Sequence, residues 1–385
     1  MSNQDPEKNI SVLLLAEDFY PKKSGGAFID WNVAKHLTDC GDNVTVVTTR
    51  IAGTKSREAA SNVDIRRPFP GSPENTQPNS LYGQLRRILF VFLVFPYLIR
   101  LMWNREFDVI YSTNHLFHPL AAVLRVLFGV PLVTFVGYSP SIHDNVSLTD
   151  PLVLLERMNF RFFMGDRALC RTPSIEKEIS RLSGVPIARL EGIVDPEEVN
   201  TAITQEDTVK LPPENETEDT VWLIFVGRLT TLKNPIKAVD LLSNLPEDYS
   251  LLLIGHGPQR DAVEDSIHQK SLDERVFLAG QLPHKQTLRA IHGSDLLLLP
   301  SKMESYGAVV FEALSLNTPV LATPVGILPS INHPHLTIAQ EEEFEKILPK
   351  VDLETNTGVD DETLERFSVN RFTREARAHL IKVTS

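Results

Sequence analysis

Short apolar runs alternate with longer amphipathic stretches along most of this chain. In the first half, the apolar runs predict strands at 11–16, 43–48, 108–112, 130–136 and 167–171. Strands that alternate with helical stretches favour the α/β class, in which helices form the crossover connections.

A polar and acidic segment at 201–219 interrupts this alternation and predicts a linker. We therefore expect an N-terminal domain over 1–200 and a C-terminal domain over 220–368, where the alternation resumes. Residues 369–385 predict one further helix. A length of 385 residues agrees with two domains, because a chain of this size is too long for a single core.

Two glutamates, Glu304 and Glu312, lie eight residues apart after an apolar run at 295–300. The run predicts a buried strand, and the residues after it predict a helix with one broad apolar face. A strand, a turn and a helix start suit a phosphate ligand, because free backbone N–H groups and the positive end of the helix dipole face the anion. The two carboxylates would then accept hydrogen bonds from sugar hydroxyls. The alternative is that both are exposed residues near a helix start, where acidic side chains are favoured.

Two strand-and-turn segments precede this pair. The first ends an apolar strand at Gly227 and continues with Arg228 and Lys233, five residues apart. The second closes a strand with a Gly-x-Gly-Pro turn that begins at Gly255. The turn lacks the third glycine and the helix start of a dinucleotide-binding loop, so a dehydrogenase is not expected. For the two cations, the alternative to phosphate binding is a solvated turn.

These three segments, in this order and at these separations, resemble the signatures of the retaining GT-B glycosyltransferases of the glycogen-synthase-like family four. The resemblance extends over residues of about 10 to 330. It implies an α/β fold of GT-B architecture, with two Rossmann-like parallel-sheet domains that face a central cleft. The N-terminal domain would bind the acceptor and the C-terminal domain the nucleotide sugar. The helix at 369–385 would pack back towards the N-terminal domain.

The resemblance also implies a retaining transfer that needs no metal. Arg228 and Lys233 would stabilise the negative charge that develops on the β-phosphate as the anomeric C–O bond breaks. Glu304 would hold hydroxyls of the donor sugar and Glu312 the ribose, and neither is assigned as a covalent nucleophile. The sequence has no Asp-x-Asp pair of the kind that metal-dependent transferases use. The expected co-substrate is a UDP- or GDP-sugar, with no cofactor.

The resemblance gives a set of expected site residues. The expected catalytic residues are Arg228, Lys233 and Glu304. The expected donor-binding residues are Gly25, Gly26, Gly227, Arg228, Lys233, Glu304, Ser305, Tyr306, Gly307 and Glu312. In the family, the loop that ends in the two N-terminal glycines contacts the donor, because glycine lets backbone approach closely. Without the other motifs, such a glycine pair indicates only a turn.

The chain departs from the family pattern in three places. Val136 stands where the family usually has a histidine that contacts the donor sugar, and the candidate substitutes are His115, His118 and His143. Glu191 replaces the usual asparagine before Gly-Val-Asp. The loop after the last strand reads Gly-Ile-Leu-Pro-Ser from Gly326, in place of Gly-Gly-x-Pro-Glu. These departures bear on the donor sugar and on activity rather than on the fold.

The segment 85–105 favours contact with a membrane surface. Its apolar run, 88–99, is shorter than the roughly 20 residues that a bilayer-spanning helix needs, and it contains a proline. The segment carries arginines at positions 86, 87, 100 and 105. Flanking arginines and aromatic residues suit a helix at the interface between lipid and water. The alternative is a helix that belongs only to the core.

Net charge and cysteine content indicate which partners and which cellular compartment to expect. A net charge of −12 argues against a nucleic-acid partner. The two cysteines, Cys40 and Cys170, are expected to be reduced thiols in the cytoplasm, and residues 1–9 are polar, unlike a secretion signal. Together with this setting, the family resemblance implies a hexosyltransferase in the cytoplasm or at the inner membrane face, acting on a lipid-linked or polysaccharide glycan. The alternative is a non-catalytic nucleotide-sugar-binding subunit of a glycan-assembly system, which the valine at 136 favours.

Overall fold

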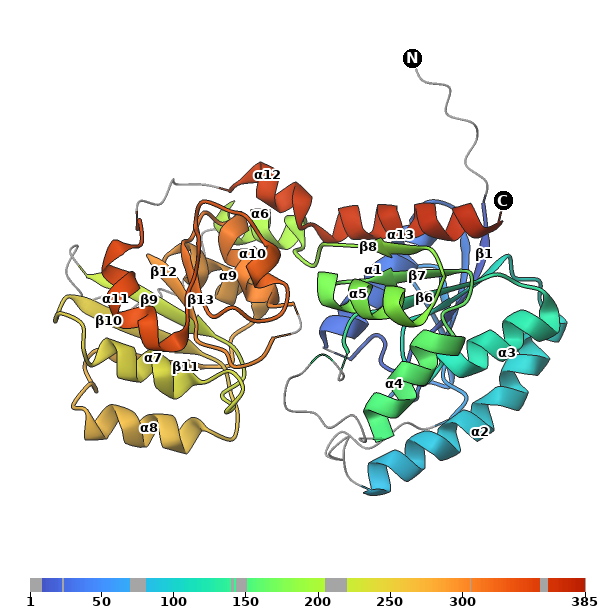
Figure 1. Ribbon diagram of the computed structural model, residues 1–385, viewed down its shortest axis with the longest axis horizontal. Coiled ribbons are helices and arrows are strands. Elements are labelled where there is room, and N and C mark those ends of the chain that lie inside the picture. Colours follow the sequence, from blue (N-terminus) through green and yellow to red (C-terminus); the bar gives the residue numbers. More distant parts are fainter. Residues whose placement is uncertain are drawn as a thin grey trace, which may run out of the picture. The chain divides into compact units, whose positions relative to one another are not determined.

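The computed structural model describes residues 9–22, 24–69, 81–139, 142, 151–204, 220–304, 306–353 and 359–384. The chain divides into two compact units (Figure 1). The first consists of Met1–Glu191 and Val369–Ser385, and the second of Gly192–Ser368. Each unit is built around a parallel sheet with connecting helices, which confirms the predicted fold class.

The first unit contains an eight-stranded sheet with the order β3-β4-β2-β1-β5-β6-β7-β8. The strands are β1 (Ser11–Leu15), β2 (Asn43–Val47), β3 (Arg57–Ala60), β4 (Val63–Arg66), β5 (Val109–Ser112), β6 (Leu132–Val136), β7 (Arg167–Cys170) and β8 (Ile187–Arg189). All neighbours are parallel except β3 and β4. The five strands predicted from apolar runs are all present. The hairpin of β3 and β4 was not predicted, because its two four-residue strands, Arg57–Ala60 and Val63–Arg66, contain no continuous apolar run.

Helices complete the first unit. They are α1 (Gly25–Asp39), α2 (Leu81–Asn104), α3 (His118–Phe128), α4 (Pro151–Phe162), α5 (Pro173–Leu182) and α13 (Val369–Thr384). The last of these packs against α1 and against β5, β6 and β7. Arg377 of α13 donates from Nε to Oδ2 of Asp42 over 2.8 Å, and both side chains are buried. A buried ion pair therefore ties the end of the chain to the loop before β2.

The second unit contains a six-stranded parallel sheet with the order β11-β10-β9-β12-β13-β14. The strands are β9 (Val221–Val226), β10 (Tyr249–Ile254), β11 (Val276–Gly280), β12 (Leu296–Leu299), β13 (Val320–Ala322) and β14 (Leu336–Ile338). The helices are α6 (Pro196–Thr204), α7 (Pro235–Leu242), α8 (Arg260–Gln269), α9 (His284–His292), α10 (Ala308–Ser315), α11 (Phe344–Ile347) and α12 (Asp361–Arg366).

Both faces of this second sheet are covered. Along β9, Trp222 and Ile224 belong to one apolar cluster, whereas Leu223 and Phe225 belong to another. Successive side chains of a strand point to opposite faces, so these two clusters are the cores above and below the sheet. With both faces covered, the loops at the carboxyl ends of the strands are the usual place for a ligand site in a sheet of this kind.

The segment 85–105 lies mostly within α2, which contains Pro96. No helix in the described part of the chain combines the length and apolarity needed to cross a bilayer.

Candidate functional site

The predicted site residues of the second unit gather at the carboxyl ends of β9, β10 and β12. These strands are neighbours in the sheet and run in parallel, so the loops that follow them emerge at one edge. The loop after β9 carries Arg228 and Lys233, and the loop after β12 carries Glu304. The backbone N–H of Lys302 donates to the carbonyl of Leu232 over 2.8 Å and links the two loops.

The Gly-x-Gly turn after β10 supports the Arg228 loop. A Cβ atom on Gly255 would overlap with the carbonyl oxygen of Gly227, and one on Gly257 would overlap with the backbone of Leu229. Gly255 also has a φ of +148°, which side chains rarely adopt. The N–H of Leu229 donates to the carbonyl of His256 over 3.1 Å. The glycines therefore allow the loop after β10 to pack backbone against backbone on the loop that carries Arg228.

Lys233 and Glu304, both predicted as catalytic, form an ion pair between Nζ and Oε1. The hydroxyl of Ser301 donates to the same carboxylate oxygen over 3.0 Å. Glu304 is nearly buried, with 7% of its side chain exposed, compared with 30% for Lys233. Arg228, by contrast, is exposed and makes no ion pair with any described residue. The two predicted cations at this sheet edge therefore differ, because Lys233 is paired with Glu304 whereas Arg228 has no ion-pair partner among the described residues.

The turn before α10 is anchored from inside the unit. Gly307, at the N-cap of α10, has a φ of +76°, a conformation that favours glycine. The Tyr306 side chain is buried against Phe311, and its hydroxyl oxygen accepts from the N–H of Gly192 over 2.8 Å. Tyr306 therefore holds the turn in place through its side chain, and only its backbone faces the helix start. Ser305 lies outside the described residues.

Glu312 has a partner that sequence patterns did not predict. Nε2 of His284, at the start of α9, lies 3.1 Å from Oε1 of Glu312. Nδ1 of the same ring contacts Glu198 of α6. The hydrogen bond to Glu312, together with the contact to Glu198, raises the pKa of His284 to about 9. At neutral pH, the imidazolium therefore donates to both carboxylates. Oε2 of Glu312 has no hydrogen-bond partner among the described residues.

Gly25 and Gly26 belong to the first unit, whereas the other predicted site residues belong to the second. They open α1, whose N-cap Ser24 accepts from the N–H of Ala27 over 3.2 Å. Both glycines are exposed, and a Cβ atom on Gly26 would meet nothing within 4 Å. Packing within the unit therefore does not require glycine at position 26.

Val136 is buried and belongs to one apolar cluster with Phe160 and Met164. A side chain at this position of the first unit is therefore part of the core. Of the three candidate substitute histidines, His118 is also fully buried, with Nδ1 2.9 Å from the hydroxyl of Ser112. Burial lowers the pKa of His118 well below its usual value, so this ring is neutral.

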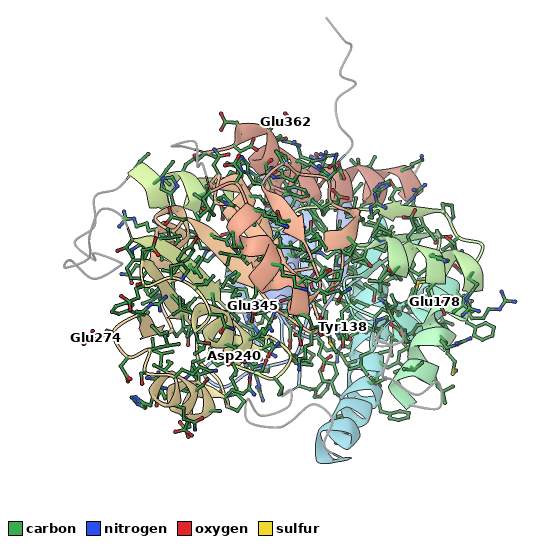
Figure 2. All side chains as sticks on the ribbon, turned by 60° about the vertical axis from the view of Figure 1, so that its left-hand side comes forward. Tyr138, Glu178, Asp240, Glu274, Glu345 and Glu362 are labelled. Atoms are coloured by element: carbon green, nitrogen blue, oxygen red, sulfur yellow. The ribbon has the colours of Figure 1, made fainter. Side chains whose placement is uncertain are left out.

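Of the candidate substitutes for the family histidine, His115 is more accessible than His118. Its Nε2 lies 3.0 Å from the carbonyl of Tyr138 and 3.6 Å from the buried carboxylate of Glu156. Tyr138 is half exposed and is labelled in Figure 2. Burial lowers the pKa of His115 despite the nearby carboxylate. His143 lies outside the described residues.

The described residues include no cluster of three or more His, Cys, Asp or Glu side chains that could hold a metal ion. Cys40 and Cys170, which both lie in the described part of the chain, form no disulfide. Burial raises the pKa of the Cys170 thiol to about 12, so this side chain is a core group rather than a nucleophile.

Two family models match the chain, and each of them covers most of one unit. Residues 26–193 match the glycosyl transferase 4-like domain, and residues 207–352 match the glycosyl transferases group 1. Among curated proteins, the GPI3 subunit of phosphatidylinositol N-acetylglucosaminyltransferase from Saccharomyces cerevisiae is 23% identical over 355 residues, covering 86% of this chain and 72% of that protein. The 2-deoxystreptamine glucosyltransferase of Streptomyces kanamyceticus is 29% identical over 240 residues, covering 59% of this chain and 62% of that protein.

Solved structures show the same fold over almost the whole chain. Sucrose-phosphate synthase from Thermosynechococcus elongatus superposes with a TM-score of 0.74 at 16% identity, covering 97% of this chain and 99% of that one. HepE from Anabaena, in complex with UDP and glucose, superposes with a TM-score of 0.64 at 17% identity, covering 97% and 100%.

Proposed function

The chain belongs to the GT-B fold glycosyltransferases of the family 4 type, and on this basis we propose that it is a retaining hexosyltransferase that needs no metal. The donor is a UDP- or GDP-sugar, and the acceptor is a lipid-linked or polysaccharide glycan. Three similar proteins support this choice. The yeast relative is named as a phosphatidylinositol glycosyltransferase subunit, the Streptomyces relative as a glucosyltransferase, and the Anabaena structure contains UDP and glucose.

The exposed guanidinium of Arg228, at the same sheet edge as the Lys233–Glu304 pair, carries this proposal most directly. A guanidinium can bind two phosphate oxygens at once, and here it is held at the sheet edge by the glycine turn of Gly255. As the anomeric C–O bond breaks, negative charge accumulates on the β-phosphate oxygen. Arg228 stabilises that charge directly, and the start of α10 adds backbone N–H groups.

The two glutamates have different proposed roles. Oε1 of Glu304 already accepts hydrogen bonds from Lys233 and Ser301. The carboxylate accepts a further hydrogen bond from a hydroxyl of the donor sugar. Oε1 of Glu312 accepts a hydrogen bond from His284, and Oε2 accepts hydrogen bonds from the ribose hydroxyls. Each carboxylate is thus oriented by a fixed donor before the ligand arrives, which lowers the entropic cost of binding.

The proposed location is the cytoplasm, at the inner face of the membrane that holds the acceptor. The segment 85–105 makes peripheral contact with that membrane, and no nucleic acid is a partner. The loop of Gly25 and Gly26 contacts the donor.

A second candidate function is a non-catalytic subunit that binds a nucleotide sugar within a glycan-assembly system. The valine at position 136, where the family usually has a histidine, favours this candidate. The name of the yeast relative, a subunit of a transferase, also supports it.

Nucleotide release tests the proposal. The purified chain, a membrane lipid extract and a panel of UDP- and GDP-sugars are assayed together, with Arg228→Ala and Glu304→Ala as inactive variants. Glu274→Ala is the matched control, because Glu274 is an exposed glutamate of the same unit outside the site (Figure 2). Release with one donor that requires the extract and is lost in both site variants supports the transferase. Binding of a nucleotide sugar without turnover in any extract supports the subunit instead, and Glu304→Ala then leaves partner binding intact.

A further inference from the structure

The outer surface of α2 is apolar, which is unusual for a helix that covers a core. The inner face contributes Phe90, Val94 and Leu98 to the core of the first unit. The outer face carries Leu89, Phe92, Leu93 and Trp103, and the last is 79% exposed. A helix that only covers a core has polar residues on its outer face. The outer face of α2 is therefore suited to a second apolar environment.

The apolar surface continues onto α3. This helix exposes Val123, Val126 and Leu127. The rings of Trp103 in α2 and Phe128 in α3 meet edge to face, with centroids 6.3 Å apart. The two helices pack against each other, as Figure 1 shows, so their exposed apolar residues form one surface.

A third helix of the same unit, α4, has the same character. Leu154, Met158 and Phe162 follow one another at intervals of four, and all three are exposed. This spacing places them on one face of the helix. The helix packs beside the start of α3, where Asn159 Nδ2 donates to the carbonyl of His115 over 2.9 Å. We refer to the exposed residues of α2, α3 and α4 together as the three-helix surface.

Arginines provide most of the charged residues of these helices. Their sequences contain six arginines and a single glutamate, Glu156, which is buried. Arg125 pairs with Asp166 beside α3, whereas Arg100 and Arg161 are exposed and form no ion pair with described residues. The chain as a whole has a net charge of −12. The three-helix surface is therefore an apolar and cationic region on an acidic protein.

We propose that the three-helix surface binds an anionic membrane surface, with the exposed aromatic and aliphatic side chains entering the lipid interface and the arginines contacting lipid phosphates. This inference rests on the proposed function, and extends its membrane contact from α2 to α3 and α4. On a protein of net negative charge, a cationic and apolar region is attracted to an anionic surface more strongly than the average protein surface is, so an anionic membrane also sets the orientation of the first unit. A second copy of the chain is a poorer occupant, because a two-fold contact would place arginines against arginines.

Vesicle flotation of the full chain tests this inference. Vesicles of phosphatidylcholine alone are compared with vesicles that contain about one-third phosphatidylglycerol. Juxtamembrane arginines contribute about 1 kcal/mol each, so the double variant Arg100→Glu, Arg161→Glu should bind the anionic vesicles at least roughly tenfold more weakly. The control Lys350→Glu reverses an exposed charge in the second unit and should bind as the unaltered chain does.

A second variant tests the apolar part. Phe92 and Phe162 are 72% and 66% exposed, so Phe92→Ser with Phe162→Ser should fold normally and yet lose vesicle binding. Equal binding to neutral and anionic vesicles, or no binding to either, would overturn the inference. So would dimers in sedimentation experiments that the serine variant abolishes. Nucleotide release with detergent-solubilised extract is measured on the same variants. If release persists without vesicle binding, only this inference fails, and if vesicles bind without any release, only the proposed function fails.

Discussion

Lys233 and Glu304 lie 71 positions apart in sequence and share one ion pair at the edge of the second sheet, with the carboxylate nearly buried and the ammonium partly exposed. A buried carboxylate depends on its cation more than an exposed cation depends on the carboxylate, because only the buried group has lost its water. The pair is therefore asymmetric, and its two members have different expected responses to substitution.

Replacing Lys233 with methionine should reduce both stability and turnover. The variant leaves Glu304 with Ser301 as its remaining partner, at an expected cost of about 1–3 kcal/mol in the free energy of unfolding. Loss of a charge at the reacting phosphate should lower kcat/KM by roughly 10²–10³-fold. Denaturant titration and nucleotide release measure the two effects. A stable Lys233→Met variant with full turnover contradicts the assigned role, and Lys237→Met, on α7 of the same unit, is the control.

Two glycine-to-alanine variants should have opposite effects. In Gly255→Ala, the new methyl group overlaps with the Gly227 carbonyl, so we expect a loss of about 2 kcal/mol or more in stability. In Gly26→Ala, the methyl group meets nothing in its own unit, and alanine favours a helix, so stability should stay constant or rise by up to about 1 kcal/mol.

Donor turnover separates the two glycines further. If the loop of Gly26 contacts the donor as proposed, Gly26→Ala should raise the KM for the donor although the chain remains fully folded. An unchanged KM would show that this loop has no donor contact. Thermal denaturation of both variants provides the stability comparison.

The pH dependence of stability should contain a contribution from His284. Its pKa is about 9 in the folded chain, above the usual 6.5. The stabilising contribution is therefore complete below about pH 6.5 and is lost as the pH rises through 9. The His284→Gln variant has no such contribution to lose. Between pH 6.5 and 9.5, the melting temperature of the variant should therefore fall less than that of the unaltered chain. Parallel curves for the two proteins would contradict the assignment. The KM for the donor should rise over the same range, because Glu312 loses its oriented partner.

Asp30, in α1, should make the chain less stable at neutral pH than at mildly acidic pH. Burial raises the pKa of this carboxyl to about 7, although Thr113 donates to it over 2.6 Å. The folded state holds a proton that the unfolded state has lost above about pH 4, so stability decreases as the pH rises from 4 to 7. Asp30→Asn removes this decrease. At pH 8 the variant should be more stable by roughly 2–4 kcal/mol, and near pH 4 the difference should vanish. Urea titrations at pH 4 and pH 8 measure the free energy of unfolding of the variant and of the unaltered chain. An equal difference between the two proteins at both pH values would refute the prediction.

Much of the architecture follows from local sequence patterns, whereas several side-chain partners do not. Buried parallel strands have continuous apolar runs, and the glycine turns have a fixed order, so both are visible in sequence. The contact of His284 with Glu312 and Glu198 was not visible in the sequence. These three residues come from three different helices, and Glu198 lies within the segment predicted as the first domain. The buried position of the Tyr306 ring was missed for a similar reason, since its hydroxyl is satisfied by the distant N–H of Gly192.

The helix α13 gives the first unit a particular order of assembly during synthesis. Residues 1–191 leave the ribosome first, but the helix that covers part of their sheet, together with the arginine for Asp42, follows only after the whole second unit. Domains usually fold as they emerge, so the second unit can complete its core while the first still lacks one helix. A chain cut after residue 368 would thus release a finished second unit joined to an unfinished first one, with the apolar surface under α13 open to chaperones and proteases.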